Sequence, residues 1–247
     1  MTRLRVRYAK VGRICWTSHR DTARMWERAF RRVNLPVAYS LGFSPRPKVS
    51  FGLALPTGYE SVAEYLDIEL ADEQPTADLD ALNTRLSAAL PAGVDVLTSA
   101  VAQRHGAEDR APSLQEEITV CTWRMAVVPL ERGGASVDAS LRRLLDAESI
   151  VVTRQRKQRD VTEDIRPAIG AVRVVEETDE GTWLECDLGT QPRSLRPSEL
   201  VLALGSDLEA RHVRRLHQWI ERAGARWEPL MAPPAATEAP HAMVRAS

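Results

Sequence analysis

The chain has 247 residues, of which 44% are hydrophobic and 27% charged, a composition typical of a soluble globular protein. No run of about 18 apolar residues occurs, which argues against a transmembrane helix, and the N-terminus lacks the apolar core of a signal peptide. We therefore expect a cytoplasmic protein without membrane contact. Cys15, Cys121 and Cys186 lie far apart and form no CxxC pair, so we expect reduced thiols and no metal site held by this chain.

The charge of the chain is unevenly distributed. The formal net charge is −1, yet residues 1–48 contain twelve Lys or Arg against only Asp21 and Glu27. The compensating acids come later, for example between Glu60 and Asp80. This asymmetry indicates that one face of the molecule meets an anionic partner.

The first half of the chain predicts a β-α-β-β-α-β order, the ferredoxin-like arrangement. Apolar residues alternate with arginines from Arg3 to Tyr8, which predicts a half-buried strand with the arginines on its open face. Ser18 with Asp21 forms a capping box for a helix that ends at Asn34 and Pro36. The other expected elements are extended segments at Val37–Ser40, Val49–Leu55, Val62–Leu70 and Val94–Val101, and a helix at Ala77–Leu90.

The second half, which follows a polar linker at residues 103–114, is predicted to repeat this order. Ser206 with Glu209 predicts a second capping box, which opens a helix that runs to Ala223 and is closed by Gly224. The other expected elements are strands at Glu117–Val128 and Ser149–Thr153, helices at Val137–Asp146 and Pro197–Leu204, a basic loop at Arg154–Arg159, and a hairpin of Ala171–Glu176 with Thr182–Leu188.

The predicted fold class is therefore α+β. It consists of two ferredoxin-like β-α-β-β-α halves in tandem, a C-terminal helix and a disordered tail. The expected domains are residues 1–104 with the basic helix, residues 113–230 with the C-terminal helix, and the Ala- and Pro-rich tail of residues 231–247.

The first helix carries a row of arginines on one side, opposite an apolar face that contains Trp26 and Phe30. Solvated helix faces usually mix charges of both signs, so a row of like charges favours binding to a polyanion over a plain solvated face. Arginine also favours phosphate, because its planar fork binds phosphate oxygens in pairs. The arginines of this row are Arg20, Arg24, Arg28, Arg31 and Arg32.

The loop from Tyr39 to Lys48 extends the basic surface. Two aromatic residues, Tyr39 and Phe43, have two equally weighted interpretations, stacking on bases or closing the core. Prolines at 45 and 47 stiffen the chain around Arg46 and favour an outward, binding role. The candidate binding residues of this loop are Tyr39, Ser40, Phe43, Arg46 and Lys48.

Three residues are candidates for acid or base chemistry. His19 lies beside Asp21 at the helix start, where an exposed polar role and a capping role are the alternatives. Asp164 with Arg166 forms an Asp-x-Arg pair, which is more often structural. Lys157 and Arg166 join the nucleic-acid-binding candidates, and we expect their loop, Arg154–Pro167, to share one cleft with Tyr39–Lys48. No P-loop, GxGxxG or GxSxG motif occurs.

Several motifs in combination resemble the radical SAM-linked protein family, a bacterial domain of unknown function, over about residues 1–205. The resemblance implies partnership with a radical SAM protein that would carry a [4Fe–4S] cluster and S-adenosylmethionine. This chain lacks the cysteine triplet for such a cluster and is similar to the stand-alone form of the domain. The motifs include Ser-His-Arg-Asp at 18–21, Tyr-Ser-Leu-Gly-Phe-Ser-Pro-Arg-Pro at 39–47, Leu-Ala-Leu-Pro-Thr-Gly at 53–58 and Leu-Arg-Pro-Ser-Glu-Leu at 195–200.

These observations favour an RNA-binding accessory protein that presents tRNA or rRNA to a radical SAM modifying enzyme. One alternative is an RNA-modifying enzyme in its own right, with Asp21 or Asp164 as the catalytic acid. Another is a protein-interaction module that docks on the radical SAM partner without RNA. No sequence-specific readout of DNA is expected.

Overall fold

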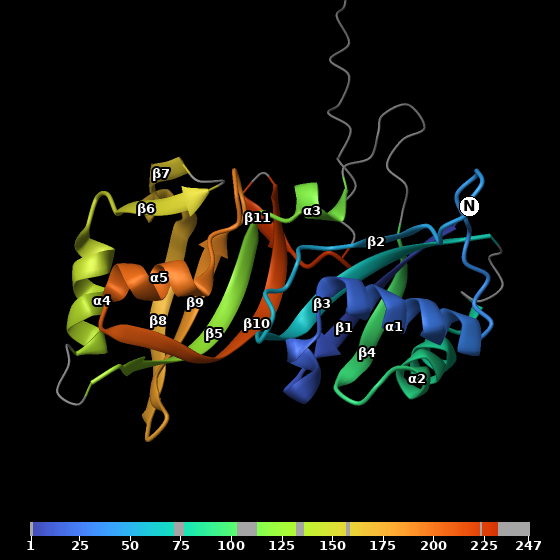
Figure 1. The fold of residues 1–247 in the computed structure, drawn as a ribbon, viewed down its shortest axis with the longest axis horizontal. Coiled ribbons are helices and arrows are strands. Elements are labelled where there is room, and N and C mark those ends of the chain that lie inside the picture. The colour runs from blue at the N-terminus through green and yellow to red at the C-terminus, as the bar shows by residue number, and fades with distance from the viewer. Residues whose placement is uncertain are drawn as a thin grey trace, which may run out of the picture.

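The computed structural model of the chain describes residues 2–71, 77–102, 113–131, 136–156, 159–222 and 224–231. These residues form an α+β fold in which five α-helices accompany one large, mostly antiparallel sheet (Figure 1). The large sheet has the strand order β4-β1-β3-β10-β5-β9-β8, and β6 with β7 forms a separate hairpin. The predicted disordered tail lies outside the described residues, apart from Met231.

The first half has the β-α-β-β-α-β order that the sequence predicted. Its strands pair in the order β4-β1-β3, antiparallel throughout, and β2 pairs with the far part of β3. Its elements are β1 (Thr2–Lys10), the 3-10 helix η1 (Gly12–Trp16), α1 (His19–Arg32), β2 (Val49–Phe51), β3 (Glu60–Leu70), α2 (Leu79–Ala89) and β4 (Val94–Ala102).

The second half pairs its strands in the order β10-β5-β9-β8, again antiparallel throughout. A basic loop was expected at Arg154–Arg159, but Arg154–Arg156 belong to the end of β6 and Arg159 begins β7. Residues 157–158 lie outside the described residues. The elements are α3 (Leu114–Glu117), β5 (Val120–Pro129), α4 (Val137–Asp146), β6 (Val151–Arg156), β7 (Arg159–Asp164), the 3-10 helix η3 (Arg166–Ala168), β8 (Ile169–Thr178), β9 (Gly181–Gly189), α5 (Pro197–Leu204), β10 (Leu208–Arg222) and β11 (Ala225–Trp227).

The predicted C-terminal helix between Ser206 and Ala223 is wrong, because this stretch forms the 15-residue strand β10. The register of β10 against β5 shifts twice, between Arg211 and Arg214 and again after Arg215. Each shift adds one residue to β10, so its inward-facing residues are separated by two or three positions and not always by two. In the sequence, this irregular spacing resembles the apolar face of a helix. The buried residues of β10 are Leu208, Val213, Arg215, Gln218 and Ile220.

The two halves meet where β10 runs parallel to β3. Their register contains only two pairs, Arg214 with Glu60 and Arg215 with Ser61. Two apolar clusters pack on the sheet, one around Trp26 of α1 and one around Met125 of β5. The second cluster also includes Ala63 and Tyr65 of β3, so the first half contributes to both clusters.

The alternation in the sequence predicted that the arginines of β1 lie on an open face, but the structure covers them. Arg5 is only 8% exposed. Its Nε and Nη2 atoms donate to the carboxylate of Asp67 at 2.7 and 2.9 Å, and its Nη1 donates to the carbonyl of Pro229 at 2.9 Å. Arg7 pairs with Glu228 at 2.6 Å. The segment after β11 thus crosses this face of β1, and these arginines hold the fold together instead of facing a partner.

Trp26→Ala should reduce the free energy of unfolding by about 3–5 kcal/mol, because the Trp26 ring is completely buried between Tyr8 and Phe30. Urea denaturation would measure the loss. Trp16→Ala is the matched control, since Trp16 is 72% exposed and its removal should cost less than about 1 kcal/mol. Equal losses for the two variants would contradict the placement of α1 on the sheet.

Candidate functional site

The arginine row of α1 is fully on the surface. All five arginines are exposed, while Thr22, Trp26, Ala29 and Phe30 are buried on the opposite side. Within the described ranges, Arg20, Arg28 and Arg31 make no ion pair, and Arg24 has only a 3.4 Å contact with Asp21. Most of the positive charge of this helix is therefore available to a partner.

Ser18 caps the start of α1, as the sequence predicted, although Asp21 does not bond the Ser18 backbone N–H as it would in a full capping box. The backbone N–H of Asp21 donates to the hydroxyl of Ser18 at 3.1 Å, and that hydroxyl donates to the Asp21 carboxylate at 2.7 Å. His19 lies with its ring edge-on to Phe51, with 5.1 Å between the ring centroids. Asp21 thus has a structural role, and His19 stays an exposed candidate without a partner acid in the described part of the chain.

A groove of about 540 Å³ lies between α1 and the segment Pro45–Phe51. Its polar lining consists of Arg20, Glu27 and Arg46. Its apolar lining includes Trp26 and Phe30 from the helix. The structure thus brings together the helix and the end of the loop, two of the three segments that the sequence singled out for binding.

The tip of the Tyr39–Lys48 loop is the most exposed apolar surface of the described chain. Leu41 is 101% exposed and Phe43 is 107% exposed, while Tyr39 is half exposed. Phe43 therefore does not close the core, which removes one of its two interpretations. Sequence reasoning passed over Leu41, whose apolar character at a loop tip was the available signal.

Two of the predicted binding residues of the loop have local partners. The hydroxyl of Ser40 accepts the backbone N–H of Arg46 at 3.0 Å, and the backbone N–H of Ser40 donates to the carbonyl of Arg46 at 2.8 Å. Lys48 forms an ion pair with Glu69 at 3.2 Å. Ser40 thus closes the loop, and Arg46 is left as its exposed cation.

The side chains of Asp164 and Arg166 both form hydrogen bonds with backbone groups. The Asp164 carboxylate accepts the N–H groups of Ile150 at 2.8 Å and of Arg166 at 2.9 Å, which holds its pKa below the usual range. The Arg166 guanidinium donates to the carbonyls of Ala147 at 3.0 Å and Ile169 at 3.1 Å. The pair therefore anchors the end of α4, and Lys157 lies outside the described residues.

The expected common cleft of the two basic loops does not form. The segment between α1 and β2 lies at one end of the long axis, whereas β6 and β7 lie at the other (Figure 1). One loop follows α1 and the other follows α4. Because the halves are joined through β3 and β10, these helices lie side by side along the sheet, and the two loops do not meet.

Two larger cavities lie between the halves. One, of about 880 Å³, separates Leu53–Thr57 from residues 193–199 at the start of α5. The other, of about 870 Å³, is bordered by Trp16, Trp183 and His212. Sequence reasoning missed both, because each is built from segments far apart in the chain.

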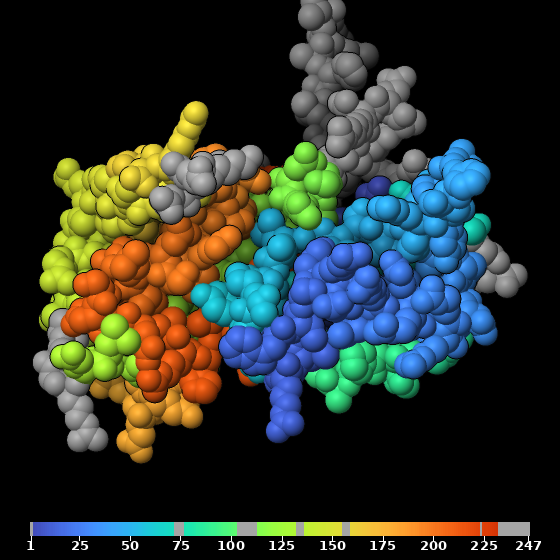
Figure 2. Space-filling model, viewed as in Figure 1, coloured from blue at the N-terminus to red at the C-terminus, as the bar shows by residue number. Residues whose placement is uncertain are grey.

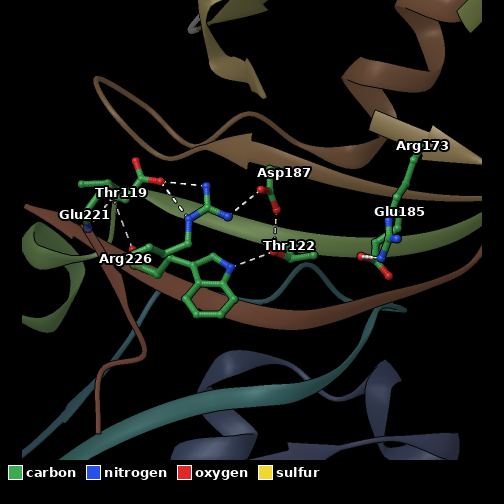
Figure 3. A network of polar contacts seen from close by, with 8 residues as sticks. Thr119, Thr122, Arg173, Glu185, Asp187, Glu221 and Arg226 are labelled. Atoms are coloured by element: carbon green, nitrogen blue, oxygen red, sulfur yellow. Dashed lines mark hydrogen bonds and ion pairs between the residues drawn. The ribbon is translucent and has the colours of Figure 1, made fainter. Parts of the chain in front are cut away.

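The open face of β5, β9 and β10 carries a network of paired polar residues (Figure 3). The Asp187 carboxylate accepts the Thr122 hydroxyl at 2.5 Å and Nη1 of Arg226 at 2.6 Å. Arg226 also donates to Glu221 at 2.9 Å and lies over the ring of Trp219. Because Arg226 of β11 bonds to Asp187 of β9 and to Glu221 of β10, we assign this network to holding β11 on the sheet.

Within the described ranges, no group of three or more His, Cys, Asp or Glu side chains is placed to hold a metal ion. Burial raises the pKa of the Cys121 thiol to about 11 and also raises the pKa of Cys186. These two thiols are therefore protonated near neutral pH. None of the described helices has both the length and the apolar run that crossing a bilayer requires.

Comparison with protein families gives a match that covers more than half of the chain. The family described as "Uncharacterized protein conserved in bacteria (DUF2344)" matches residues 3–197, which is most of the chain. The chain belongs to this family. The matched residues include α1, the Tyr39–Lys48 loop and the first residue of α5, while β10, which joins the halves, follows the matched stretch. No curated protein matches the chain.

The ion pairs of Glu163 can be tested by mutation. They hold Arg154 of β6 and Arg193, which both line the larger cleft, the cavity of about 880 Å³. The guanidinium groups of Arg193 and Arg154 lower the pKa of Glu163 to about 2. Glu163→Gln should therefore lower the free energy of unfolding at pH 7, and the effect should shrink as the pH falls from about 4.5, the ordinary glutamate pKa, toward 2. Denaturant unfolding across this pH range would measure it.

Glu148→Gln is the control for this change, because Glu148 is exposed and has no ion pair within the described residues. It should have little effect at any pH in the range. A Glu163→Gln effect that stays constant between pH 7 and pH 2 would contradict the ion pairs with Arg154 and Arg193.

Proposed function

We propose that this chain binds RNA through α1 and the Tyr39–Lys48 loop and presents tRNA or rRNA to a radical SAM modifying enzyme. The observation that supports it most is the exposed arginine row of α1 beside Arg46. Like charges at this spacing repel one another, so the row costs stability unless an anion neutralises it. A sugar–phosphate backbone supplies such charge at regular intervals.

The loop tip supports a role beyond electrostatics. An exposed aromatic ring such as Phe43 stacks on unpaired bases irrespective of their sequence. The groove between α1 and Pro45–Phe51 lies between the arginine row and the loop. In this proposal the helix contacts phosphates, and the loop holds an unstacked nucleotide for the partner.

A second candidate, a protein-interaction module, is supported by the same tip. Leu41 and Phe43 together form an exposed apolar pair, and such pairs are typical of protein contacts. The partner enzyme would then meet the tip while RNA lies on α1, or would meet the whole basic face without RNA.

The third candidate, an RNA-modifying enzyme in its own right, has less support. Asp21 caps α1, and Asp164 accepts two backbone N–H groups and has a lowered pKa. An ionised, fully hydrogen-bonded carboxylate is poorly suited to donate a proton near neutral pH. His19 is then the remaining candidate for acid or base chemistry.

The partner and its cofactors are proposed from the resemblance to radical SAM-linked proteins. The [4Fe–4S] cluster and S-adenosylmethionine would belong to the partner, and the complex would work in the cytoplasm. The strand orders β4-β1-β3-β2 and β10-β5-β9-β8 support the finer description of the fold as two ferredoxin-like halves, with β6–β7 as an insertion.

RNA binding by the isolated chain should weaken steeply with salt. Each neutralised phosphate of a single strand contributes about −0.7 to the slope of log K against log salt, so three contacts give a slope near −2. Arg24→Glu with Arg28→Glu should abolish binding and leave the fold intact, because both side chains are exposed. Filter binding of single-stranded RNA at several salt concentrations would measure both effects.

The control for this pair is Arg142→Glu with Arg173→Glu, which changes the net charge equally on exposed sites of α4 and β8. It should keep most of the binding. Equal losses for the two double variants would show that only net charge matters and that α1 is not the site.

The loop tip can be tested separately with Leu41→Ser and Phe43→Ser together. Both side chains are fully exposed, so the thermal midpoint should stay within about 2 °C of the wild type. If Phe43 stacks on a base, affinity for single-stranded RNA should fall about fivefold to a hundredfold. Unchanged RNA affinity, with loss of partner capture, would favour the protein-interaction module.

A further inference from the structure

The larger cleft between the halves is built from two segments that the proposed RNA site does not use. One wall is Leu53–Thr57, and the other is residues 193–199, which lead into α5. Figure 2 shows the surface hollowed between the cyan segment and the orange segment that contain them. The floor includes Cys121 and Trp123 of β5 and Arg215 of β10. The cleft holds about 880 Å³, a volume within the range of small-molecule sites.

The floor contains two buried donors without an acceptor. Arg215 is 2% exposed and Trp123 is 4% exposed. The Nε of Arg215 and the Nε1 of Trp123 have no hydrogen-bond partner within the described residues. Buried donors are nearly always paired in folded proteins, so an unpaired set at a cleft indicates a missing acceptor.

The rest of Arg215 is held firmly. Its two terminal nitrogens donate to the carbonyls of Leu53 and Ala54, each at 3.0 Å. Its guanidinium lies 4.8 Å from the centre of the Trp123 ring and pairs with Glu64 at 3.2 Å. The two unpaired donors are thus fixed against one another at the base of the wall Leu53–Thr57.

The free positive charge of the cleft lies at Arg196. Four arginines line the cleft, but Arg154 and Arg193 pair with Glu163, and Arg215 pairs with Glu64. Glu199 accepts Nη1 of Arg193 and the backbone N–H of Arg196, both at 2.9 Å. The exposed side chain of Arg196 makes no ion pair within the described ranges. The first turn of α5 lies beside it and adds the positive end of a helix dipole.

We propose that this cleft binds a small phosphate ester with an apolar or planar body. The phosphate would lie against Arg196 and the first turn of α5, where hydroxyl groups of Ser194 and Ser198 also line the cleft. The body would lie over the leucines of the walls and the edge of Trp123. An acceptor atom on that body would pair with the unpartnered donors of the floor.

This inference does not depend on RNA binding by α1, because the two sites share no residue. The proposed phosphate ester is a free, metabolite-sized molecule. The probes are therefore small molecules with and without a base, and with and without a phosphate, so that the contributions of the two groups can be separated.

The test is isothermal titration calorimetry on the full chain with four probes. The probes are adenosine 5′-monophosphate, ribose 5-phosphate, adenosine and inorganic phosphate. Adenosine 5′-monophosphate should bind with one-to-one stoichiometry, and adenosine should bind at least about tenfold more weakly, because it lacks the charge-assisted contacts of the phosphate. Ribose 5-phosphate should bind more weakly than adenosine 5′-monophosphate, because it lacks the planar base that would lie over the edge of Trp123.

Two variants locate the binding. Arg196→Gln should weaken binding about tenfold, whereas Arg142→Gln, which alters an exposed arginine of α4, should leave it unchanged. Trp123→Phe keeps an aromatic ring but removes the indole N–H together with part of the ring volume, so it should also weaken binding, with circular dichroism as the check on folding.

Three results would overturn the proposal. They are the absence of saturable heat with all four probes, equal affinity for inorganic phosphate and both esters, and equal losses in Arg196→Gln and Arg142→Gln. Arg24→Glu with Arg28→Glu should leave binding of adenosine 5′-monophosphate intact, so failure of the cleft and failure of the RNA site can be told apart.

Discussion

The architecture depends on a buried arginine at the seam of two half-sheets. Arg215 lies on β10, where that strand meets β3 over only two residue pairs. So short a parallel contact supplies few backbone hydrogen bonds, and side chains complete the junction. Arg215 pairs with Glu64 of β3 and holds the carbonyls of Leu53 and Ala54, while Arg214 pairs with Glu60. Removing one member of such a buried pair leaves the other charge unpaired, which typically costs about 3–5 kcal/mol.

The junction between β3 and β10 determines which segments of the two halves lie close together. Because β10 closes the second half and pairs with the first, the helices of both halves pack on the same side of one sheet (Figure 1). Arg215 bonds to the carbonyls of Leu53 and Ala54 and holds the segment Leu53–Thr57 at the junction. Because this segment forms one wall of the larger cleft, the cleft depends on the junction. The Tyr39–Lys48 loop, which leaves the far end of α1, projects from the end of the molecule instead.

The two sets of arginines near the N-terminus show why charge counting is incomplete. Arg5 and Arg7 of β1 bind Asp67 and Glu228 and hold the C-terminal segment on the sheet. Arg20 and Arg28 of α1 face solvent without an ion pair in the described residues. Both sets contribute equally to the positive charge of residues 1–48, yet only the second can meet an anion from solution.

The sequence by itself determined the elements whose signals are local. The bounds of α4 and α5, the cap of α1 at Ser18 and the exposed arginine face follow from apolar spacing and capping residues, which act within one or two turns. The hairpin of β8 and β9 follows from alternation around a turn. The tertiary structure decided the rest. Two register shifts made β10 resemble a helix in the sequence, and only its pairing with β5 revealed a strand.

The same division holds for the candidate sites. The arginine row could be predicted because all its members lie on one helix, and the structure left it exposed as expected. The exposure of Phe43 and the cleft around Arg215 could not be predicted. Each depends on contacts between segments more than ten residues apart, and a single sequence carries no signal for which distant segments meet. The position of a charge along the chain was thus determined by sequence, and whether that charge is buried, paired or free was decided by packing.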